Sequence, residues 1–185
     1  MSDQIFVTAE ATPNPQTMSF RFSKVLLDRS LPFENAAEAN ISPLAAKLFG
    51  FPWTSHVLLG ESFVSVTKQD WVDWDVLAEP LKGLIQEHLN SGAPLLIENL
   101  PVEDEISADD TPIVRQIKDI IAREIKPVVA LDGGDVAFVQ FEKGVLALRF
   151  KGACSGCASQ EVTLKDGIEV RLKESIPEIK EVISV

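Results

Sequence analysis

The sequence holds only two cysteines in 185 residues, and this scarcity excludes the disulfide framework that stabilises many small secreted domains. No apolar run approaches the roughly 20 residues that a membrane-spanning helix needs. The first residues, Met1 to Gln4, lack the basic and apolar regions of a secretory signal, and no Arg-rich presequence follows them. We therefore expect a protein of the reducing cytoplasm.

Positively charged residues are scarce in the first part of the chain. Residues 1–110 carry 6 Lys and Arg against 17 Asp and Glu, whereas residues 111–185 carry 11 of each kind. The net charge of −11 therefore lies wholly in the N-terminal part. Such a balance repels phosphate backbones and anionic lipids, so nucleic acid and membrane surfaces are poor partners. A basic protein partner is compatible with this charge, and so is a role in solubility alone.

The length and the 45% hydrophobic content support packed cores, in one ordinary domain or two small ones. Residues 98–112 combine a dense acidic run with two prolines, a composition typical of an interdomain linker. A solvated tether is favoured here over an acidic docking strip. We therefore expect an α+β protein of two small domains, residues 1–97 and 113–185.

The N-terminal domain is expected to contain two hairpins and two helices. Residues 4–9 and 18–22 indicate strands around a proline-rich turn, and residues 55–59 and 62–67 indicate strands that pair across Gly60-Glu61. Ser42 and Pro43 are a cap and first turn for a short helix. An amphipathic helix opens near Asp75 and places apolar residues on one face: Leu77, Leu81, Leu84, Ile85 and Leu89.

The C-terminal domain is expected to follow the order α-β-β-α-β. Thr111-Pro112 begins a helix with an isoleucine face that ends before Pro127, and two strands follow over residues 136–141 and 145–150. A last helix begins near Ser159 and carries a buried stripe at every fourth residue: Leu164, Ile168, Leu172 and Ile176. The segment 179–185 closes the domain.

The two cysteines, Cys154 and Cys157, form a Cys-x-x-Cys pair between the second strand and the last helix. Thiolates are the preferred ligands of zinc, copper(I) and iron–sulfur clusters, and this spacing lets both sulfurs face one metal centre. A strand-to-helix turn also lowers a thiol pKa through the helix N-terminus. Two ligands are half a site, and the spacing alone also fits a pair of ordinary thiols, a zinc half-site or a thiol–disulfide redox pair.

The other candidate ligands are less suited to a soft metal. His56 and His88 have no further ligand or base close to them in the sequence, so we expect no chemistry from them. Asp132 and Asp135 flank a Gly-Gly turn, but carboxylates are hard oxygen donors that fit an iron–sulfur centre poorly. Without a Lys-Ser pair or a ribose-binding acid, the two glycines do not form a nucleotide loop either.

Three motifs in order identify a family. The chain contains Leu131-Asp132-Gly133-Gly134-Asp135-Val136, then Gly152-Ala153-Cys154-Ser155-Gly156-Cys157-Ala158, then Val162-Thr163-Leu164-Lys165-Asp166-Gly167-Ile168-Glu169. With these motifs, residues 113–185 resemble the C-terminal domain of the NifU-like iron–sulfur cluster scaffolds and carriers. Residues 4–97 resemble the companion N-terminal domain of the Nfu type, through Thr12-Pro13-Asn14-Pro15 and Phe63-Val64-Ser65-Val66-Thr67-Lys68.

The resemblance implies a carrier and not an enzyme. It implies that Cys154 and Cys157 hold a [4Fe-4S] cluster bridged between two subunits, which arrives from an upstream donor and passes to apo iron–sulfur acceptor proteins. The family usually has proline after the second cysteine and Ser or Thr two residues further, where this chain has Ala158 and Gln160. Both ligands are intact, so this departure affects the stiffness of the loop and the lifetime of the cluster. The alternatives are a thiol–disulfide redox protein and a zinc-bridged structural dimer.

Overall fold

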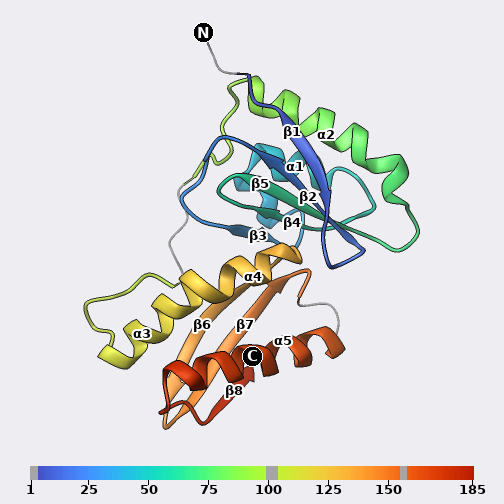
Figure 1. Cartoon of the computed structure of the whole chain (residues 1–185). Coiled ribbons are helices and arrows are strands. Elements are labelled where there is room, and N and C mark those ends of the chain that lie inside the picture. The colour runs from blue at the N-terminus through green and yellow to red at the C-terminus, as the bar shows by residue number, and fades with distance from the viewer. Residues whose placement is uncertain (1–3, 99–103, 155–157) are drawn as a thin grey trace.

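The structure is a computed structural model that describes residues 4–98, 104–154 and 158–185. Two sheets, each with its own hydrophobic core, lie one above the other in Figure 1. The N-terminal sheet has five strands in the order β1-β2-β5-β4-β3, and the C-terminal sheet has three in the order β6-β7-β8. The predicted α+β class with two domains is confirmed.

The N-terminal sheet is antiparallel throughout and contains both predicted hairpins. Its strands are β1 (Val7–Ala11), β2 (Thr17–Phe22), β3 (Leu31–Phe33), β4 (Thr54–Leu59) and β5 (Phe63–Lys68). The proline-rich turn joins β1 to β2, and within it the amide of Thr17 donates a hydrogen bond to the carbonyl of Asn14 at 2.9 Å. The hydroxyl of Thr12 donates to the same carbonyl at 2.9 Å, so residues on both sides of the turn are hydrogen-bonded to Asn14.

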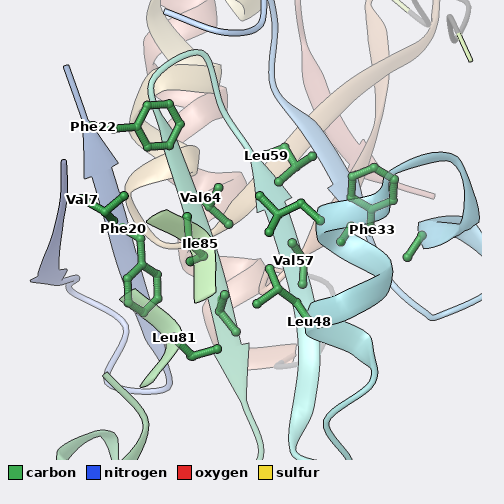
Figure 2. Close-up of a cluster of buried hydrophobic side chains, with 14 of the residues drawn as sticks. Val7, Phe20, Phe22, Phe33, Leu48, Val57, Leu59, Val64, Leu81 and Ile85 are labelled. Atoms are coloured by element: carbon green, nitrogen blue, oxygen red, sulfur yellow. The ribbon is translucent and has the colours of Figure 1, made fainter. Parts of the chain in front are cut away.

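One face of this sheet is covered by helices α1 (Pro43–Phe49) and α2 (Trp74–Asn90). The Ser42 hydroxyl accepts a hydrogen bond from the Ala45 amide at 3.2 Å, which confirms the predicted cap. Figure 2 shows how alternate strand residues meet the helices in the core, with labels on Val7, Phe20, Phe22, Phe33, Leu48, Val57, Leu59, Val64, Leu81 and Ile85. The apolar stripe of α2 is therefore core packing, as predicted.

The opposite face of the sheet, which we call the second face, is also buried over parts of β2, β4 and β5. Its residues alternate with those of the core, and Thr17 pairs with Thr67 across β2 and β5 as Ser19 pairs with Ser65. Leu58 of β4 lies beside Ser65 on the same face. All five side chains are at most 6% exposed. Alternating small hydroxyl residues usually mark a solvated face of a sheet, so another part of the molecule must cover this one.

The C-terminal domain begins with a helical run that passes through Pro127. It consists of α3 (Pro112–Ile120), a π-helical turn η2 (Ile121–Ile125) and α4 (Lys126–Leu131). The prediction that the helix ends before Pro127 is wrong. In the π turn the Lys126 amide donates to the Ile121 carbonyl, and this wider spacing accommodates a proline ring that would clash in a regular helix.

The rest of the domain follows the predicted order. Strands β6 (Gly134–Glu142) and β7 (Val145–Gly152) form an antiparallel hairpin, α5 (Ala158–Ser175) crosses over, and β8 (Glu181–Ser184) pairs parallel to β7. Ile168, Leu172 and Ile176 are buried in the core, and Leu164 packs against it. None of the described helices combines the length and apolar character needed to cross a bilayer.

The second half of the acidic stretch is bound to the C-terminal domain. Asp104 accepts a hydrogen bond from the Phe138 amide at 2.7 Å and pairs with Lys126 Nζ at 2.7 Å. Asp110 pairs with Lys118 Nζ at 2.8 Å, and this ammonium lowers the pKa of the Asp110 carboxyl. The prediction of a solvated tether is therefore wrong at Asp104 and Asp110, because lysines of the helical run bind the carboxylates of these two residues. Residues 99–103 lie outside the described part of the chain.

Candidate metal centre

Cys154 lies just beyond the end of β7, and its side chain is buried with 7% of its surface exposed. Helix α5 begins at Ala158, so the cysteine pair falls between a strand and a helix, as predicted. Cys157 lies outside the described residues. The described part of the predicted site is therefore Cys154 and the residues around it.

Two glycine turns form the wall around the Cys154 sulfur. Gly133 (φ 79°) and Gly152 (φ 69°) adopt left-handed backbone conformations that other residues rarely take. They are joined where the Ala153 amide donates to the Gly133 carbonyl at 3.3 Å. A Cβ added at Gly134 would collide with the Cys154 Sγ. The Gly-Gly turn thus provides the space for the sulfur, and a soft thiolate ligand set between close backbone segments fits an iron–sulfur cluster.

Cys154 lines a cavity of about 600 Å³. Much of its wall is apolar and comes from the helical run and α5, with Ile125, Val128, Val129, Leu164 and Ile168. The wall also includes Pro13 and Asn14, which belong to the β1–β2 turn of the N-terminal domain. Both domains therefore contribute to the surroundings of the cysteine. The sequence predicts a proline-rich turn at Asn14, and no local pattern indicates its place on the cavity of Cys154.

The two aspartates of the Gly-Gly turn have different environments. Asp132 lines the same cavity as Cys154, and burial raises the pKa of its carboxyl. Asp135 lines a separate cavity of about 1070 Å³ between the domains. Burial raises the pKa of Asp135, and Lys126 Nζ, 3.7 Å from its carboxylate, opposes that shift. Of these two aspartates, only Asp132 lines the cavity at the cysteine.

The histidines lie in the N-terminal domain, and neither lines the cavity at Cys154. His88 is buried on α2 with its Nδ1 atom 3.3 Å from Lys47 Nζ, and His56 Nδ1 lies 3.0 Å from the Ser55 hydroxyl. Within residues 4–98, 104–154 and 158–185, no three His, Cys, Asp or Glu side chains are grouped as metal ligands. The described residues therefore leave the cysteine pair as the candidate centre.

Comparison with known proteins identifies the family. A family model described as a NifU-like domain matches residues 117–183, and one described as the N-terminal domain of the scaffold protein Nfu/NifU matches residues 7–92. The class of protein is thus set by two matches in the expected order. The chain belongs to the NifU-like family and has both the Nfu-type N-terminal domain and the NifU-like domain.

Full-length relatives agree with the domain matches. The mitochondrial NifU-like protein 4 of Arabidopsis thaliana is 37% identical over 182 residues, which cover 95% of this chain and 64% of that protein. The human mitochondrial NFU1 iron-sulfur cluster scaffold homolog is 36% identical over 183 residues, which cover 98% of this chain and 72% of that protein. The chain thus spans about two thirds of the length of these relatives. A solution structure of a NifU-like protein from Saccharomyces cerevisiae aligns with 54% of this chain and 92% of its own, at 22% identity and a TM-score of 0.47.

The comparison contradicts the predicted cytoplasmic location, since the relatives are named as mitochondrial proteins. That prediction depended on two thiols without a disulfide framework, which suit a reducing compartment, and on the lack of a secretory signal or an Arg-rich presequence in the sequence. A need for reduced thiols does not distinguish the cytoplasm from another reducing compartment.

Proposed function

We propose that the chain carries [4Fe-4S] clusters, and that Cys154 and Cys157 in the C-terminal domain, residues 113–185, are its ligands. The observation that carries the proposal is the setting of Cys154, whose sulfur occupies the space left by Gly134 beside two left-handed glycine turns. Backbone this close to a thiolate can donate amide hydrogen bonds to cluster sulfurs. The relatives named as iron-sulfur cluster scaffolds support the same assignment.

Ligand arithmetic favours a cluster shared between two chains. A [4Fe-4S] cluster normally takes four thiolates, and the sequence contains two cysteines. A second copy related by two-fold symmetry, the commonest arrangement in homo-oligomers, supplies the other two. The loaded protein is then a homodimer held largely by its metal–sulfur bonds.

The proposed activity is transfer and not catalysis. An acceptor apoprotein whose thiolates replace Cys154 and Cys157 one at a time takes the cluster intact, and an upstream donor loads the site by the reverse exchange. Ligand exchange of this kind needs no general acid, base or nucleophile beyond the thiols themselves.

Anaerobic reconstitution of the full chain, followed by iron, sulfide and zinc analysis, tests the proposal. We expect about four irons and four sulfides per two chains, on a species that light scattering identifies as a dimer. Tight zinc without sulfide would indicate a zinc-bridged structural dimer instead. A chain that takes up neither metal but cycles between dithiol and disulfide would indicate a redox protein.

A further inference from the structure

The second face of the N-terminal sheet contacts the turns that carry the cysteine. A Cβ added at Gly133 would lie 2.6 Å from Thr17 Cγ2 and 3.3 Å from Thr67 Oγ1, so these threonines pack directly on the Gly-Gly turn. The two hydroxyls are hydrogen-bonded to each other at 2.8 Å, and both oxygens and the Thr17 methyl group lie next to Gly133. Small side chains and a glycine allow the two backbones to approach closely.

Two further contacts come from other parts of the N-terminal domain. The Gly152 amide, at the start of the cysteine loop, donates a hydrogen bond to Glu34 Oε1 at 3.2 Å, just beyond the end of β3. Pro13 and Asn14 line the cavity at Cys154. Three separate segments of the N-terminal domain therefore meet the two glycine turns and the cysteine. Such agreement indicates a specific docked arrangement, because a casual contact of two tethered domains would not bury five neighbouring residues on one face of a sheet.

We propose that the N-terminal domain is an intramolecular cap on the cluster site, and that loading requires this cap to leave. The inference rests on the proposed function, in which a second chain must bring two thiolates up to Cys154. In the docked arrangement Cys154 is 7% exposed, and Pro13 and Asn14 of the β1–β2 turn line its cavity together with residues of α5. The N-terminal domain and the incoming chain would thus occupy the same space next to the Cys154 sulfur.

The competition gives the N-terminal domain a defined role. While the chain is empty, docking shields the thiol from oxidants and adventitious metals. When a cluster binds, the free energy of forming the metal–sulfur bonds offsets the free energy lost with the interdomain contacts. The domain that is displaced then exposes its second face, which carries Leu58 among small hydroxyl residues and can contact another protein only in the loaded state.

Thiol accessibility in the metal-free full chain tests the cap. In a Cys157→Ser background, Cys154 is the single thiol and its alkylation rate by iodoacetamide reports how often the cap opens. Thr17→Lys places a long charged side chain on the second face at the Gly133 contact, and Thr8→Lys makes the same change on an exposed position of β1. We expect alkylation about tenfold faster in Thr17→Lys, the change in opening expected from losing contacts worth one strong hydrogen bond, and an unchanged rate in Thr8→Lys.

A second variant guards against misfolding of the first. Glu34→Ala removes the exposed carboxylate that accepts from the Gly152 amide, and Glu10→Ala on β1, which removes a carboxylate paired with Arg21, is its matched control. Glu34→Ala should also speed alkylation, and circular dichroism should show the wild-type fold. Equal rates in Glu34→Ala, Glu10→Ala and the parent would overturn the cap.

Iron uptake by chains with both cysteines then tests the gating. Thr17→Lys and Glu34→Ala should load faster than the wild type and reach the same final iron content. Faster alkylation with unchanged loading kinetics would overturn the gating role. If neither the wild type nor a variant takes up iron, the proposed function fails, whereas the alkylation rates still decide whether the cap exists.

Discussion

The two sheets of this chain bury their second faces in different ways. In the N-terminal sheet, Thr17, Ser19, Ser65 and Thr67 extend the burial over two neighbouring strands. In the C-terminal sheet the longest run that is buried on both faces is the first four residues of β6, and Val139 further along is 39% exposed. Those four residues, Gly134–Ala137, follow the turn that contacts the N-terminal domain. At the start of β6, burial on both faces therefore coincides with the contact to the N-terminal domain, and that place adjoins the cysteine.

The largest expected effect is the loss of the cluster, because its proposed ligands belong to the C-terminal domain and not to the N-terminal domain. Cys154→Ser should abolish stable cluster binding, because a hydroxyl is a poor ligand for iron in a sulfide cluster. The visible absorption of the reconstituted protein measures the loss. Since Cys154 is part of the core, we also expect a small loss of stability, of about 1 kcal/mol. Reconstitution of Cys154→Ser to wild-type absorption would remove this thiol from the ligand set.

The next effect compares one glycine from each domain. Gly134→Ala should destabilise the fold by about 1–3 kcal/mol, the usual cost of overpacking, and weaken cluster binding, because its Cβ would collide with the Cys154 sulfur. Gly83→Ala on α2 is the matched control, since no atom lies within 4 Å of its added Cβ. The control should gain about 0.5–1 kcal/mol from helix propensity. Urea unfolding of both variants gives the comparison, and equal stabilities would contradict the role given to Gly134.

The third comparison concerns the acidic stretch between the domains, where the expected effect is on stability. Asp104→Ala removes a hydrogen bond to the β6 backbone and an ion pair with Lys126. The expected loss in the free energy of unfolding is about 1.5–3 kcal/mol, the range for hydrogen bonds to charged groups. Glu105→Ala changes an exposed neighbour of which only the backbone carbonyl is used, by Lys118. Both variants behaving alike in denaturant would mean that the stretch is a tether after all.

The smallest effect is a pH dependence that belongs to the N-terminal domain, which holds both histidines. Burial, followed by the charge of Lys47, lowers the pKa of His88 below its ordinary value of 6.5. The unfolded chain then takes up the proton at a higher pH than the folded one, so stability falls as the pH drops below that ordinary value. Burial lowers the pKa of His56 as well, with the same sign. Urea midpoints at about pH 7.5 and 5.5 should differ less in His88→Gln than in the wild type; an unchanged difference would exclude His88 as a source.

The periodic elements could be predicted from the sequence because their burial follows their own repeat. The isoleucines of the first C-terminal helix and the stripe from Leu164 to Ile176 each face a single core. The cysteine pair could be located for a similar reason, since its chemistry lies in one short motif. Strand β3 was missed because three residues, Leu31–Phe33, are too few to show an alternation.

What the sequence did not predict depends on contacts between distant segments. Thr17 and Ser65 look like residues of a solvated face, because small hydroxyl side chains carry no sign of the surface that will cover them. The acidic residues from Asp104 to Asp110 suggest a tether until the lysines that bind them are brought near by the fold. Pro13 and Asn14 have no chemical feature in common with Cys154, which lies some 140 positions further along the chain. Only the tertiary structure places them on one cavity.

The π turn before Pro127 sets the rotational phase of the helical run. Ile113, Ile117, Ile121, Ile125 and Val129 follow one another at every fourth residue, and all five belong to or pack against the same core. In a regular α-helix such a spacing drifts by about 40° at each step, since four residues exceed one turn of 3.6, and the last members would rotate away from the core. The wider π turn, in the middle of the series, rotates the helix back. One additional residue in the hydrogen-bonded π turn thus keeps Val129 on the inner side of the helix. It also sets the orientation in which α4 leads into Gly133 and the cysteine cavity.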